Sequence, residues 1–73
     1  MAAMATRRVS KLGRNIKRYR RLRGLGQHDL AKLSDVSQST ISRLEDGQIQ
    51  DIMLKGAERL AKALGVTLGE MAA

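Results

Sequence analysis

Hydrophobic residues recur at intervals of three and four positions near the start of the chain, which is the spacing of an amphipathic helix. From about Ser10 to Arg23, the side chains of Leu12, Ile16 and Tyr19 fall in one narrow sector of a helical wheel. The opposite side of the wheel is basic and comprises Lys11, Arg14, Lys17, Arg18 and Arg21. We therefore expect a helix with one face in the core and a basic face outside.

A second apolar stripe follows Asp51, which we expect to cap a helix that Gly65 ends. Its apolar face comprises Met53, Leu54, Ala57, Leu60, Ala61 and Leu64, and its outer face comprises Lys55, Glu58, Arg59 and Lys62. Residues 67–70, Thr-Leu-Gly-Glu, match a capping box and predict a final short helical turn. The loop before this helix contains three apolar residues, Ile49, Ile52 and Met53. They belong either to the core or to an exposed patch for self-association.

Two more short helices are expected between these segments. Gly26 is an acceptable cap for a helix over residues 27–34. Residues 35–37, Asp-Val-Ser, form a tight turn because Asp tolerates the left-handed conformation. The Ser of this turn caps a helix over residues 38–46, which Gly47 closes.

No stretch of the chain shows the sustained alternation of a β-strand, so the sequence predicts an all-α fold of five short helices. Residues 10–73 are expected to form one domain, preceded by a flexible basic arm over residues 1–9. Within the domain, residues 27–46 form a helix-turn-helix unit. Its inward side chains are expected to be Leu30, Val36, Ile41 and Leu44.

The composition narrows the possible functions. The 73 residues include no Cys and a single His, so they offer no disulfide framework and no zinc cluster. A domain of this size gains stability from oligomerisation or close helix packing. No apolar run approaches the ~20 residues of a membrane span. We expect neither an enzyme nor a cofactor, because there is no nucleophile–base pair, metal-ligand spacing or phosphate loop.

Positive charge is concentrated at one end of the chain. Residues 1–28 carry nine basic and no acidic side chains, whereas residues 29–73 carry five basic and seven acidic ones. A domain with one strongly basic end is suited to bind a polyanion. Nucleic acid is the first candidate, and the alternative is an anionic membrane surface contacted by a helix over residues 7–23.

The outward face of the helix over residues 38–46 suits DNA. Its side chains are short or hydrogen-bonding and include no acid: Gln38, Ser39, Ser42 and Arg43. A helix fits the major groove, where Gln matches adenine and Arg matches guanine.

Residues 27–47, QHDLAKLSDVSQSTISRLEDG, resemble the phage-repressor and Cro family of DNA-binding domains, the XRE family. The resemblance continues at Leu12, Gly13 and Ile16 and in residues 61–66, AKALGV. It covers roughly residues 11–71 and implies a lambda-repressor-like fold whose helix-turn-helix docks in the major groove. Asp35 stands where the family usually has Gly.

The resemblance also implies roles for individual residues. Bases would be contacted by Gln38, Ser39, Ser42 and Arg43, and phosphates by Gln27, Ser37 and Thr40. Arg20, at the edge of an apolar face, and Glu45 would form a structural ion pair between the first and third helices. Residues 48–51 bring no positive charge. Further phosphate contacts are therefore expected from the arm and first helix, at Arg7, Arg8, Arg14 and Lys17.

We therefore expect a sequence-specific transcriptional regulator, a repressor that binds a palindromic operator as a homodimer with half-sites about 34 Å apart. The alternative is an antitoxin or other regulatory protein that holds a protein partner, such as a toxin or an anti-repressor, and binds DNA for autoregulation. The expected location is the prokaryotic cytoplasm, at the nucleoid, with a phage-encoded origin also possible. Neither a metal ion nor a cofactor is expected.

Overall fold

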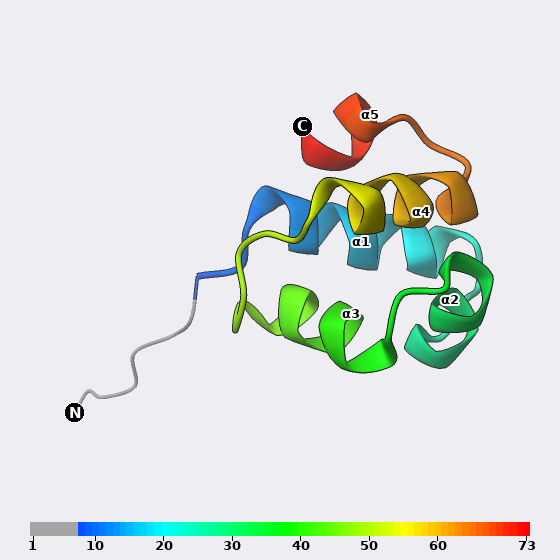
Figure 1. Cartoon of the computed structure of the whole chain (residues 1–73), viewed down its shortest axis with the longest axis horizontal. Coiled ribbons are helices and arrows are strands. Elements are labelled where there is room, and N and C mark those ends of the chain that lie inside the picture. The colour runs from blue at the N-terminus through cyan, green and yellow to red at the C-terminus, as the bar shows by residue number, and fades with distance from the viewer. Residues whose placement is uncertain (1–7) are drawn as a thin grey trace.

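The computed structural model describes residues 8–73, which form five α-helices and no strand. The helices are α1 (Lys11–Leu22), α2 (Gln27–Ser34), α3 (Gln38–Asp46), α4 (Leu54–Leu64) and α5 (Leu68–Ala72). As Figure 1 shows, α1 runs through the middle of the molecule between α4 and α3, α2 closes one end, and α5 lies beside α1 and α4. The expected all-α fold is confirmed.

A single apolar core joins all the helices. Every helix contributes at least one fully buried side chain to it, and these are Ile16, Leu30, Ile41, Leu44, Leu60, Leu64 and Met71. Val36, in the turn between α2 and α3, is half-buried and packs against the same cluster. The inward side chains expected for the helix-turn-helix unit therefore hold α2 and α3 at a fixed angle.

Except for the start of α4, the helix ends lie close to where local signals predicted them. The Oγ atom of Ser37 accepts a hydrogen bond from the backbone N–H of Thr40 at 3.2 Å, which caps α3. Asp35 adopts the left-handed conformation with φ 60°, which allows the tight turn between α2 and α3. Thr67 and Glu70 form the expected capping box of α5, with each side chain accepting from the other residue's backbone N–H.

The expected start of α4 was wrong. Asp51 does not cap this helix, because the chain stays extended up to Met53 and the helix begins at Leu54. The side chain of Asp51 instead accepts a hydrogen bond from the next backbone N–H, that of Ile52, at 3.0 Å. The loop before α4 brings Ile49 and Ile52 against the core.

The apolar stripe of α4 is buried only along its second half. Leu60, Ala61 and Leu64 lie in the core, whereas Met53 and Leu54 are 83% and 64% exposed. The burial of Leu54 was expected from periodicity and is wrong, because no other described element extends over this end of α4. For Met53 the sequence left both burial and exposure open. The three loop residues thus divide: Ile49 and Ile52 pack against the core, and Met53 is exposed.

The expected arm of residues 1–9 lies outside the described residues except for Arg8 and Val9. The carbonyl of Arg8 accepts a hydrogen bond from Gln50 Nε2 at 2.7 Å, so the loop before α4 holds this part of the chain. Among residues 8–73, no helix combines the length and the apolar character needed to cross a membrane.

Candidate nucleic-acid interface

The outer face of α3 gathers the residues expected to contact bases. Ile41 and Leu44 fix the inner face of the helix in the core. The opposite face carries Gln38, Ser39, Ser42 and Arg43, which line one shallow hollow of about 330 Å³. Gln27 at the start of α2 and Gln48 after α3 complete its lining. We call these six residues the α3 surface; it contains no acidic side chain.

A buried ion pair positions α3 against α1. Arg20 donates from Nε and Nη2 to the two carboxylate oxygens of Glu45, at 2.8 Å each. It also donates from Nη1 to the carbonyl of Leu25 at 2.8 Å. Hydrogen bonding to Glu45 is the main cause that raises the pKa of Arg20 above its ordinary value, against the opposing effect of burial. The guanidinium is therefore charged, and each of its three nitrogens donates a hydrogen bond, two to α3 and one to the linker before α2.

Gln27 joins this ion pair and was expected only as a phosphate contact. Its Nε2 donates to Oε1 of Glu45 at 3.1 Å. Glu45 thus links α1, α2 and α3, through Arg20 and Gln27. An amide nitrogen carries two N–H groups, so one N–H of Gln27 is free to meet a phosphate while the other stays on Glu45. This contact could not be predicted from local sequence signals, because the two residues are 18 positions apart.

Ser37 and Thr40 lie beside each other at the start of α3. The Ser37 hydroxyl accepts from the backbone N–H of Thr40 and donates to Thr40 Oγ1 at 2.9 Å. The single hydroxyl proton of Ser37 is therefore used in the hydrogen bond to Thr40, whereas the hydroxyl proton of Thr40 is not used in that bond. Of the two expected phosphate contacts, Thr40 has the better-placed donor, supported by the helix N-terminus.

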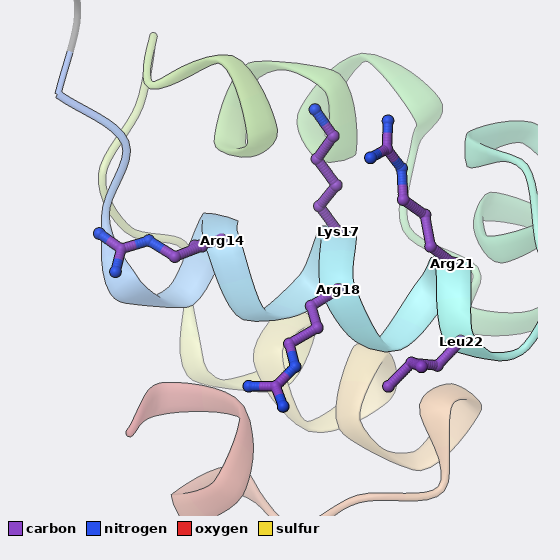
Figure 2. Close-up of a pocket in the computed structure, with 5 residues that line it drawn as sticks. All are labelled: Arg14, Lys17, Arg18, Arg21 and Leu22. Carbon is purple, nitrogen blue, oxygen red and sulfur yellow. The ribbon is translucent and has the colours of Figure 1, made fainter.

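The expected phosphate contacts on α1 lie on its outer face. Figure 2 shows Lys17 extending toward the side of α3 and Arg14 extending toward the N-terminal end of the helix. Arg8 is exposed beyond that end, and Arg7 lies outside the described residues. The α1 residues do not line the α3 surface.

Sequence reasoning missed Gln48 as a member of the α3 surface. Gly47 adopts φ 81°, which reverses the chain at the end of α3. The backbone N–H of Gln48 then donates to the carbonyl of Arg43 at 2.9 Å, which places the two residues next to each other. The glycine that ends a helix in this way is the signal that could have located Gln48.

Residues 8–73 hold no group of three or more His, Cys, Asp or Glu side chains suited to a metal ion. The polar groups of the α3 surface are instead amides, hydroxyls and one guanidinium on a convex helix. The helix that carries these groups is held in place by its caps, the core and the buried ion pair. This combination defines a helix-turn-helix protein that binds DNA.

Comparison with known proteins agrees with this class. The helix-turn-helix family model matches residues 16–71, and the chain belongs to this family, in its XRE branch. A solved structure, the restriction-modification controller protein C.AhdI from Aeromonas hydrophila, is 32% identical, with a TM-score of 0.78. The match covers 86% of this chain and 94% of that one. The comparison with curated proteins finds no match. This chain is a DNA-binding transcriptional regulator.

Proposed function

We propose that this chain is a repressor that binds a palindromic operator as a homodimer, with α3 of each copy in the major groove. The α3 surface carries the proposal: it combines hydrogen-bonding side chains, no acid, and a rigid attachment to the rest of the domain. Its function is binding, and it requires no catalytic group, metal ion or cofactor.

The α3 surface suggests a division of roles. Arg43 matches the O6 and N7 acceptors of guanine, and Gln38 matches the N6 and N7 atoms of adenine. Ser39 and Ser42 lie beside them and contact neighbouring base edges. The phosphates are contacted by the remaining polar and basic groups, namely Gln27, Ser37, Thr40, Arg14, Lys17, Arg7 and Arg8.

A homodimer accounts for the exposed end of α4. Met53 and Leu54 are adjacent, 83% and 64% exposed, and continue the apolar stripe that is buried further along the helix. A small domain gains stability by covering such a stripe with a second copy. Two copies related by a two-fold axis present two α3 helices to one side of a duplex, about 34 Å apart.

The similarity to a restriction-modification controller protein supports a regulatory role for this chain. On this proposal the protein acts in the cytoplasm, where its DNA target lies.

Selection from a random duplex library at about 150 mM salt tests the proposal, because nonspecific electrostatic binding is weak at that salt concentration. We expect an inverted repeat whose half-sites are one helical turn apart. Recovery of a single half-site would contradict the dimer but not the base contacts. If duplexes are retained but share no sequence motif, the result would contradict sequence-specific binding. It would favour the alternative, a regulatory protein that holds a protein partner.

A further inference from the structure

The outer face of α1 carries a second basic surface. Arg14, Lys17, Arg18, Arg21 and Leu22 line a shallow hollow of about 410 Å³, shown in Figure 2. We call these five residues the α1 surface. It shares no residue with the α3 surface.

The charge of the α1 surface is not neutralised by the described part of the chain. Within residues 8–73 the ion pairs are Arg20–Glu45 and Arg59–Asp35, and neither involves this surface. Each of its four cations, Arg14, Lys17, Arg18 and Arg21, has another cation three or four positions away on the same helix, so like charges are neighbours and destabilise the helix. The surface is therefore complementary to a partner that brings negative charge.

The same surface also offers apolar area. Leu22 is 67% exposed, and the methylene stems of the arginine and lysine side chains form apolar walls around it. A sugar–phosphate backbone brings charge but has no apolar side chain to cover a leucine. A segment of protein that presents both carboxylates and an apolar side chain covers the whole hollow.

The directions of the side chains divide the α1 surface between the DNA-binding side and the opposite side. Figure 2 shows Lys17 and Arg21 extending toward the side of α3, and Arg18 and Leu22 extending toward the side of α4. A duplex that lies along α3 therefore leaves Arg18 and Leu22 uncovered. A membrane surface requires a broad apolar face, but the apolar face of α1, including Ile16, is turned into the core.

We infer that the α1 surface binds an acidic amphipathic segment of a protein partner. A carboxylate of that segment pairs with Arg18, and one of its apolar side chains packs against Leu22. Lys17 and Arg21 lie at the edge shared with the operator side, while Arg18 and Leu22 belong to the partner site alone. The partner therefore binds while α3 occupies its operator, and this inference does not depend on the operator's sequence or on the dimer.

The test uses the full chain and a labelled synthetic peptide that carries Glu on one helical face and Leu on the other. A peptide with Gln in place of each Glu is its control. Binding is measured by fluorescence anisotropy at about 150 mM salt, where interactions between distant exposed charges are screened. Arg18→Glu and Leu22→Ser are compared with Lys62→Glu, which makes the same charge change as Arg18→Glu at an exposed position on α4. Circular dichroism verifies that each variant is folded.

We expect the Glu peptide to bind and the Gln peptide to bind at least about tenfold more weakly. Arg18→Glu and Leu22→Ser each weaken binding by about tenfold, Lys62→Glu changes it by less than about twofold, and a bound operator duplex does not displace the peptide. Equal losses in Arg18→Glu and Lys62→Glu would overturn the inference, because only net charge would matter. Displacement by a duplex, or binding of anionic vesicles in place of the peptide, would also overturn it.

Discussion

Gly13 in α1 lies directly against the backbone carbonyl of Leu44 in α3, and no side chain fits between them. A Cβ atom built on Gly13 would approach the carbonyl carbon of Leu44 at 2.9 Å and meet its oxygen more closely still. Backbone atoms cannot move aside as the end of a flexible side chain can. This contact therefore sets how near α1 comes to α3, and with it the burial of Ile16 and Leu44.

Gly13→Ala is expected to destabilise the protein by about 1–3 kcal/mol, because the added methyl group pushes the two helices apart. Urea unfolding followed by circular dichroism measures the change. Gly56→Ala is the matched control, since its Cβ would meet only the flexible end of Ile52, at 3.3 Å. Ala at position 56 should leave stability unchanged or raise it by up to about 1 kcal/mol. Equal losses in both variants would contradict the close contact with Leu44.

The second prediction concerns the ion pair below the α3 surface. Glu45→Ala is expected to destabilise the fold by about 3–5 kcal/mol, because Arg20 would remain buried without its partner. The side chains of Arg20 and Glu45 are 11% and 2% exposed. Thermal and urea unfolding measure the loss. Arg59→Ala is the control, because its pair with Asp35 is exposed and 3.9 Å long, so its loss should be within about 0.5 kcal/mol.

The pH dependence of the stability from this ion pair follows from the direction in which the pKa of Arg20 is shifted. Its pKa is raised in the folded state, chiefly by hydrogen bonding to Glu45. The stability that this shift contributes is fully present below the ordinary arginine range and is lost only as pH rises through the folded-state pKa. Arg20 should therefore add no pH dependence to unfolding at neutral and moderately alkaline pH.

The helix positions were predictable because their signals are local. A cap such as Ser37 contacts a backbone N–H three residues away, and Gly47 ends its helix through its own φ angle. The outward face of α3, which we propose contacts bases, followed from the same periodicity, since side chains that point away from Ile41 and Leu44 must face outward. That these side chains line one hollow could be predicted from the helix-turn-helix unit alone, without knowing how distant segments pack.

The contacts that sequence reasoning missed join segments far apart in the chain. The Nδ2 atom of Asn15 donates to the carbonyl of Met71 at 2.9 Å and attaches α5 to α1, yet 56 positions separate them. The contact between Gln27 and Glu45 is of the same kind. The exposure of Leu54 was also hidden, because periodicity identifies an apolar face but not whether another helix covers it. Such facts depend on how the helices pack.

The third prediction separates base contacts from phosphate contacts. Arg43→Ala should weaken binding to the selected operator by about 1–3 kcal/mol and relax the preference at one base pair. Lys17→Ala should weaken binding to all duplexes alike and reduce the slope of log K against log salt by about 0.9. Anisotropy titrations on the operator and on a scrambled duplex, over a range of salt, measure both effects. An equal loss on both duplexes for Arg43→Ala would make Arg43 a phosphate contact.

The last prediction tests the dimer at the exposed end of α4. Leu54→Lys places a charge on the apolar area formed with Met53, so self-association should fall by at least about tenfold. Both residues are largely exposed in the single chain, so the variant should keep its helical content and its core. Sedimentation measures the monomer–dimer equilibrium, and binding to one half-site measures whether α3 still functions. Leu33→Lys is the control, because Leu33 is similarly exposed, at 62%, but lies on α2. If Leu33→Lys dissociates the dimer and Leu54→Lys does not, the copies meet through α2 and the half-site spacing must be derived again from that surface.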